Sequence, residues 1–353
     1  MTPIVSPKSV LFIRRDNIGD LVCTTPLIRA VRLAHPDAKL SVLVNSYNSE
    51  VVRNNPDIDG IYVYEKEKHA QGRGRIRVYI ENLSILRNIR SARYTVAIGC
   101  GYSHSRRLER YTALTGAAHT IGYSKAGSAG SRFSYTVPLP EPAGAMHEVE
   151  AMMRLAAPLG VAAAPVPPLF VSPSADGAAN ARRALAEAGF SGKLVALHIS
   201  SRKPQNRWPK ERWVELARLI LAEFNAGVML LWSPGAASNA LHPGDDESAA
   251  WIAGKLGAGV YPYRTERLSE LISALSCADA AVCLDGGAMH ICAGLGKPIV
   301  TVWGSTDPRR WAPWGVPNVI LRKPGKDASS IEAAEAYDAF KKIAPRALIR
   351  GRE

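Results

Sequence analysis

A glycine turn late in the chain carries the residue types best suited to chemistry. The apolar run Ala280–Leu284 predicts a buried strand, and Asp285, Gly286 and Gly287 follow it at the start of a helical pattern. A strand that passes through glycines into a helix N-terminus presents unpaired backbone N–H groups and the positive end of the helix dipole, which suits phosphate. Such glycines often only permit a bend. Here they coincide with Asp285, with His290 and with a second loop rich in Trp, Ser, Thr and Asp, so we interpret the turn as an anion site.

Asp20 is the second candidate. It follows a short apolar strand predicted at 10–14 and opens a helical pattern over 21–33, in which Pro26 is tolerable only near the first turns. An aspartate at this point can be the helix N-cap. It also lies at the carboxyl end of a first strand, where open α/β sheets place their active sites. Both hypotheses stay open on spacing alone.

Strand and helix patterns alternate along the chain, which predicts an α/β fold with parallel sheets. Apolar, β-branched runs predict strands at 10–14, 40–44, 61–64, 95–98, 194–199, 227–232, 280–284 and 299–302. Helices are predicted at 211–224, 248–256 and 268–276, and helical composition returns at 329–343. The stretch 159–177 is rich in proline and small residues and predicts a linker. A length of 353 residues suits two domains.

Composition favours a globular protein of the cytoplasm. No apolar run approaches the roughly 18 residues of a membrane span, and the first residues lack the apolar core of a signal peptide. The five cysteines are odd in number and lack CxxC spacing, so we expect reduced core residues and neither disulfides nor a zinc site.

The formal charge of +13 is concentrated in residues 66–110, where 11 Lys or Arg face three acids. This stretch is either an ordinary solvated surface or a surface for phosphate-bearing partners. No nucleic-acid-binding module is evident, so we expect no nucleic acid partner. We expect instead a phosphorylated acceptor, together with peripheral contact to the anionic inner face of the inner membrane through residues 66–110.

Both sites resemble glycosyltransferase family 9, the ADP-heptose:lipopolysaccharide heptosyltransferases and their relatives. The motifs in order are Gly19-Asp20 with Thr25-Pro26-Leu27, then Leu197–Ser201 with Arg207-Trp208-Pro209, then Asp285-Gly286-Gly287 with His290, and finally 303–308. The resemblance covers roughly residues 8–320. It implies a GT-B architecture, in which two Rossmann-like parallel-sheet domains face a central cleft. We therefore expect an acceptor-binding domain at 1–165 and a donor-binding domain at 166–325. The segment 326–353 would be a C-terminal helix that packs back toward the first domain.

The resemblance also implies an inverting transfer of a sugar, expected to be heptose from ADP-heptose, onto a lipopolysaccharide core or another lipid-linked or phosphorylated glycan. Asp20 would be the base that deprotonates the acceptor, with no metal and no cofactor. Donor-binding residues would be Ser200, Ser201, Lys203, Arg207, Asp285, Gly286, Gly287 and His290. Acceptor-binding residues would be Asn17, Gly19, His104, Arg106 and Arg107.

Three departures from the family pattern leave the donor sugar and nucleobase open. Gly286 replaces a usual threonine, Asn206 replaces a usual basic residue, and 233–238 lacks an acid that can bind ribose hydroxyls. We interpret Asp245 and Asp246 as part of a surface loop and not as a metal clamp. Three alternatives remain: a transferase of another nucleotide sugar, a nucleotide-sugar epimerase on a GT-B-like fold, and a non-catalytic nucleotide-binding or nucleic-acid-binding protein.

Overall fold

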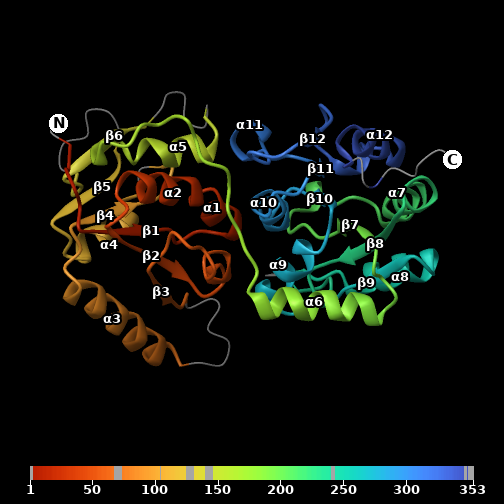
Figure 1. Cartoon of the computed structure of the whole chain (residues 1–353), viewed down its shortest axis with the longest axis horizontal. Helices are drawn as coiled ribbons and strands as arrows, with labels where there is room; N and C mark the ends of the chain where they lie inside the picture. Colours follow the sequence, from red (N-terminus) through yellow and green to blue (C-terminus); the bar gives the residue numbers. More distant parts are fainter. Residues whose placement is uncertain are drawn as a thin grey trace. The chain divides into compact units, whose positions relative to one another are not determined.

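The computed structural model describes residues 3–66, 74–103, 105–124, 131–139, 146–239, 243–345 and 348. The chain divides into two compact units, Met1–Leu169 and Phe170–Glu353 (Figure 1). The division lies inside the proline-rich stretch 159–177, four residues from the boundary expected at 165. Each unit has its own sheet and is described by itself.

In the first unit, the described strands form one six-stranded sheet in the order β3-β2-β1-β4-β5-β6, with every pairing parallel. The strands are β1 (Ser9–Ile13), β2 (Lys39–Asn45), β3 (Gly60–Tyr64), β4 (Val96–Gly99), β5 (His119–Ser124) and β6 (Tyr135–Pro138). The α-helices are α1 (Ile18–Val22), α2 (Thr25–Ala34), α3 (Arg75–Ser91), α4 (Arg106–Leu114) and α5 (Glu148–Arg154).

The second unit repeats this topology, with the order β12-β11-β10-β7-β8-β9 and parallel pairing throughout its described residues. Its strands are β7 (Lys193–His198), β8 (Ala226–Leu231), β9 (Val260–Pro262), β10 (Ala280–Leu284), β11 (Ile299–Val302) and β12 (Asn318–Leu321). Its α-helices are α6 (Ala175–Glu187), α7 (Lys210–Glu223), α8 (Asp246–Leu256), α9 (Leu268–Ser276), α10 (Gly287–Gly294), α11 (Pro308–Trp311) and α12 (Ala333–Ile343).

Both sheets follow the order of a Rossmann fold, in which the direction of progression reverses next to the first strand. The reversal falls between β1 and β4 in the first unit and between β7 and β10 in the second. Strands at this position are buried on both faces, which explains why β1 and β10 read as continuous apolar runs. The expected α/β class with two Rossmann-like parallel-sheet units is confirmed.

Helix α12 packs within the second unit. It contacts α7, β11 and β12, and Tyr337 and Phe340 belong to the core of the second unit. Its apolar face is buried there, against Phe224 among others, so α12 is part of the second unit, and the expected packing of 326–353 toward the first domain stays a prediction.

The helix predicted over 21–33 is two helices. Helix α1 ends at Val22 and α2 begins at Thr25, with Pro26 in its first turn, where the missing N–H of proline costs nothing. Across the described part of the chain, no helix combines the length and apolar character needed to cross a bilayer.

Candidate active site

The residues after β1 and β4 form the candidate site of the first unit. The two strands are parallel neighbours, and the Cys100 amide donates to the carbonyl of Ile13 at 3.0 Å, so both chains leave the sheet at one point. Loops that leave neighbouring strands in opposite directions open a crevice at the carboxyl edge, which is where ligands bind in such sheets.

Asp20 lies at this point, but it is not the N-cap of α1. Asn17 is the N-cap, and Asp20 is the third helical residue. Its Oδ2 accepts hydrogen bonds from the backbone N and the Nδ2 of Asn17, both at 3.2 Å, so Asp20 closes the first turn as the acid of a capping box does. Its side chain is 15% exposed, so the protein does not enclose it completely.

A buried arginine holds the other oxygen of Asp20. Arg14 is 2% exposed, and its Nη2 donates to Asp20 Oδ1 at 2.7 Å and to Glu148 Oε1 at 2.6 Å. Its Nη1 donates to the Cys100 carbonyl at 2.6 Å, and Asp16 lies 3.5 Å from its Nε. Burial alone would lower the pKa of Arg14. The carboxylates of Asp20, Glu148 and Asp16 raise that pKa by more than burial lowers it, so the guanidinium stays charged. The charged, buried guanidinium of Arg14 therefore holds the Asp20 carboxylate in one orientation.

A cavity of about 820 Å³ lies in the same unit beside Asp16. Its lining comes from the loops after β1, β3 and β4 and from α3 and α4, namely Arg15, Asp16, Tyr64, Glu65, Lys66, Tyr79, Asn82, Gly101, Ser103, Ser105, Arg107, Leu108 and Tyr111. The Arg15 guanidinium lies 4.1 Å from the ring centroid of Tyr111 and 4.8 Å from that of Tyr64. Burial raises the pKa of both phenols, although Arg15 opposes this, so both remain hydrogen-bond donors at neutral pH.

Among the predicted acceptor residues that the structure describes, one lines this cavity. Arg107 lines it, whereas Arg106 is exposed on α4 and is not among its lining residues. Asn17 is exposed and Gly19 is buried in the turn beside Asp20. His104 lies outside the described residues. The sequence did not identify Arg15, Tyr64 and Tyr111 as site residues. The available signals were that Tyr64 ends a strand and that Tyr111 lies in an arginine-rich helix.

In the second unit, the turn after β10 leads into α10 as predicted. Helix α10 begins at Gly287, with Gly286 as its N-cap, so its first N–H groups point out of the helix end. A Cβ placed on Gly286 would meet no protein atom within 4 Å, which shows that the space above the turn is open. The turn therefore has room for an anion against the helix N-terminus.

Asn206 joins the loops around this turn. It is buried, its Nδ2 donates to Asp285 Oδ2 at 2.7 Å, and its Oδ1 accepts from the Ser305 amide at 3.1 Å. Burial raises the pKa of Asp285, while Thr306, Lys203 and Asn206 oppose that rise. Asn206, which replaces the usual basic residue, thus connects these loops by hydrogen bonds. Lys203, whose Nζ lies 3.1 Å from Thr306 Oγ1, supplies a positive charge beside it.

Three of the remaining predicted donor residues connect loops by hydrogen bonds, and the fourth, His290, packs against a tryptophan. Ser200 Oγ accepts from the Ser233 amide at 2.8 Å, Ser201 Oγ donates to the Asp285 carbonyl at 3.4 Å, and Arg207 Nε donates to the Ser201 carbonyl at 3.0 Å. They bring the ends of β7, β8 and β10 together. His290 is 3% exposed, with its ring edge-on to Trp311 at 6.0 Å. This position supports packing, and donor binding by His290 stays a prediction.

Asp245 corrects an interpretation made from the sequence. After β8, the residues around Gly235 and Gly244 lie in close contact. A Cβ on Gly244 would overlap the carbonyl of Gly235, and the Asp245 amide donates to the Ser233 carbonyl at 2.9 Å. Asp245 thereby returns to the carboxyl edge of the sheet, beside Ser200. Its Oδ2 is buried with no hydrogen-bond partner among the described residues. Burial raises the pKa of Asp245, and Ser200 and Arg207 oppose that rise.

The described residues contain no group of three or more His, Cys, Asp or Glu side chains placed to hold a metal ion.

Comparison with known proteins gives the class. Residues 83–340 match the family model for glycosyltransferase family 9 (heptosyltransferase). The chain belongs to this family, and it is a glycosyltransferase.

Its relatives are distant. It is 24% identical over 304 residues to lipopolysaccharide heptosyltransferase 3 of Escherichia coli, which covers 84% of this chain and 83% of that protein. It is 31% identical over 140 residues to lipopolysaccharide heptosyltransferase 1 of an E. coli O18:K1:H7 strain, covering 39% of each. Among solved structures, the family 9 glycosyltransferase of Veillonella parvula has a TM-score of 0.77 at 19% identity, covering 95% of this chain and 97% of that one. The E. coli heptosyltransferase WaaC with ADP has a TM-score of 0.75 at 19% identity, with coverage of 95% and 100%. These structures share the fold.

Proposed function

We propose that this protein transfers a heptose from ADP-heptose onto a phosphorylated sugar of a lipopolysaccharide core. The observation that carries the proposal is a pair of sites at the switch points of the two sheets: an oriented carboxylate, Asp20, after β1 in one unit, and an open glycine turn on a helix N-terminus after β10 in the other. Relatives named lipopolysaccharide heptosyltransferase, and a neighbour of similar fold solved with ADP, support the choice of substrates.

In this proposal, the second unit holds the donor. Backbone N–H groups at Gly286 and Gly287 bind the diphosphate, and Lys203 stabilises the charge that develops as ADP leaves. Sugar transfer of this kind needs no redox group, and we propose that the reaction uses neither a cofactor nor a metal ion.

The first unit would hold the acceptor. Asp20 takes the proton of the acceptor hydroxyl as the oxygen attacks the anomeric carbon, the bond to the diphosphate breaks, and the configuration inverts. Arg15, Lys66 and Arg107 give the 820 Å³ cavity three cations against Asp16 and Glu65, which suits a phosphorylated sugar. Because such an acceptor is lipid-linked, we place the protein in the cytoplasm with peripheral contact to the inner face of the inner membrane.

The donor class can be tested by thermal shift with ADP, UDP, GDP and dTDP. A ligand that binds only the native state stabilises it by about 2.7 kcal/mol at a hundred times its Kd. ADP is expected to give the largest rise in Tm. A larger rise with UDP or dTDP would favour transfer of a different nucleotide sugar, and no rise with any of them would contradict a nucleotide-sugar enzyme.

Replacing Gly286 by valine should weaken ADP binding roughly 10–100-fold, because the side chain would occupy the space of a charge-assisted hydrogen bond worth about 1.5–3 kcal/mol. The free protein should tolerate the change, since its backbone at Gly286 is extended and the Cβ meets no protein atom. Calorimetric titration gives the Kd, and an unchanged Tm without ligand is the control. An unchanged Kd would remove the diphosphate from this turn.

We also propose that Asp245 supplies the acid missing from 233–238 and binds the ribose hydroxyls of the donor. Asp245→Asn should raise the Kd for ADP roughly tenfold, the cost of about one hydrogen bond to a charged group. The matched control is Asp246→Asn, because Asp246 is engaged by Trp232 Nε1 at 2.6 Å and by Arg264 at 3.4 Å. Equal effects of the two variants on the Kd would contradict the assignment.

A further inference from the structure

Helix α3 has two apolar faces, and only one of them is covered. Val78 and Ile89 are buried, and Ile85 packs against the core that also contains Tyr94. On the opposite side, Ile76, Tyr79, Ile80 and Leu83 are 78%, 68%, 59% and 53% exposed. Their spacing of i, i+3, i+4 and i+7 places them in one stripe along the helix. They are half of the eight large apolar side chains that are exposed among the described residues.

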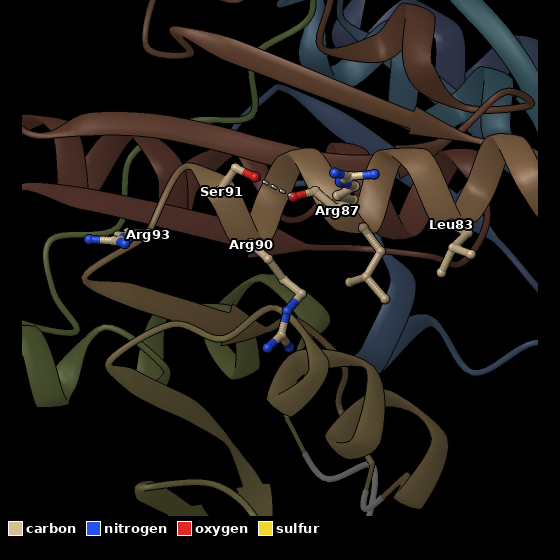
Figure 2. Close-up of a pocket in the computed structure, with 6 residues that line it drawn as sticks. Leu83, Arg87, Arg90, Ser91 and Arg93 are labelled. Carbon is tan, nitrogen blue, oxygen red and sulfur yellow. Dashed lines mark hydrogen bonds between the residues drawn. The ribbon is translucent and has the colours of Figure 1, made fainter.

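Cations continue this stripe toward the C-terminal end of α3. Arg87 and Arg90 follow Leu83 at helical spacing, and Arg93 comes just after the helix. With Leu83, Leu86 and Ser91 they line a shallow depression of about 550 Å³. Figure 2 shows Leu83 and Arg90 on the same side of the helix and Arg93 beyond its end.

The surface extends onto α4. Arg90 Nη1 donates to the carbonyl of Leu114 at 2.9 Å, and Leu114 is itself 51% exposed. Helix α3 carries four arginines against one glutamate, Glu81, which pairs with Arg77 at 3.1 Å. An exposed apolar stripe that ends in arginines is energetically unfavourable in water. The apolar side chains remain in contact with water, and the like charges of the arginines repel one another. It becomes favourable where hydrocarbon lies beside negative charge.

We propose that the outer face of α3 docks on an anionic lipid bilayer. Ile76, Tyr79, Ile80 and Leu83 enter the boundary between headgroups and acyl chains, and Arg87, Arg90 and Arg93 bind lipid phosphates. The helix of 17 residues is about 25 Å long and lies in the plane of the interface, as amphipathic membrane-surface helices do. The inference rests on the membrane contact of the proposed function and names the surface that makes it, and its test needs neither donor nor acceptor, so its failure would leave the proposed sugar transfer standing.

The test is co-sedimentation of the full chain with phosphatidylcholine vesicles, with and without phosphatidylglycerol. Wild-type protein should bind the anionic vesicles more tightly, with an affinity that falls as salt rises. The double variant Arg87→Gln, Arg90→Gln should lose roughly 25-fold in affinity for anionic vesicles, about fivefold for each arginine near the surface. The triple variant Ile76→Ser, Ile80→Ser, Leu83→Ser should lose at least tenfold on the same vesicles, the scale of burying even one such side chain.

Matched controls come from other exposed helices. Leu33→Ser changes a side chain that is 64% exposed on α2, and Arg183→Gln changes an exposed arginine on α6, so both should bind like the wild type. Circular dichroism melts check that all variants fold. Full binding by the triple variant, or no binding by the wild type, would overturn the proposal. So would a dimer in size-exclusion chromatography that the triple variant abolishes, since a second copy would then cover the stripe.

Discussion

Replacing Asp20 by asparagine is expected to lower the turnover number of sugar transfer by roughly 10²–10⁴-fold, the usual scale for loss of a general base. Asparagine keeps the volume and one acceptor oxygen, so it can still accept from Asn17 or Arg14. The new amide faces the donor of the oxygen it replaces, so the Tm should fall modestly, while the protein should stay folded at the temperature of the assay. The measurement is steady-state transfer together with a thermal melt of the same preparation.

Asp16→Asn is the matched control for Asp20→Asn. Asp16 is the neighbouring carboxylate, 3.5 Å from Arg14 Nε, but it is more exposed and lies on the turn before the helix. Burial raises its pKa, and Arg14 opposes that rise. Its loss should leave most of the turnover number and change chiefly the KM for the acceptor, because Asp16 lines the cavity. Transfer by the Asp20 variant at near the wild-type rate would reduce Asp20 to a residue that closes the first turn of α1.

Replacing Arg14 by methionine should lower the free energy of unfolding by about 3–5 kcal/mol, the cost of leaving a buried charge without its partner. Glu148 is fully buried and accepts from Arg14 at 2.6 Å, so the single change removes the cation from that buried carboxylate. The Cys100 carbonyl also loses its guanidinium donor. Urea unfolding followed by circular dichroism measures the change.

A double-mutant cycle separates this buried pair from a general loss of packing. The variant Arg14→Met, Glu148→Met should recover much of the stability, because replacing both ions by apolar groups is often close to neutral. Lys193→Met is the surface control, since its pair with Asp279 at 3.1 Å is exposed and should contribute less than about 1 kcal/mol. Additive losses from the two single changes would contradict the coupling.

The sequence predicted the inner strands well and missed several outer ones. β1, β7 and β10 are buried on both faces, so their central residues form uninterrupted apolar runs, and their bounds differ from the prediction by no more than one residue. β6, β9 and β12 are edge strands of three or four residues and are largely half-buried, so any apolar run in them is too short to indicate a strand. β5 is an inner strand that His119, Thr120 and Ser124 make polar in sequence.

The site was predictable where a motif is local and not where partners are distant in sequence. The turn at Gly286 and the position of Asp20 follow from residues that are adjacent in the chain. Arg14 appeared to be only the last residue of a strand, because Glu148, its buried partner, lies 134 residues away. Asp245 appeared to be a surface residue, because only the folded loop returns it to Ser233.

The most direct test of the account is a transfer assay with ADP-heptose and a lipopolysaccharide core that lacks its next heptose. Mass spectrometry of the acceptor and measurement of released ADP should show one heptose gained for each ADP formed, and NMR should show the inverted anomer. The Asp20→Asn enzyme should give almost no product under the same conditions. A donor sugar altered without any acceptor would instead indicate an epimerase, and transfer from another nucleotide sugar with none from ADP-heptose would contradict the proposed donor.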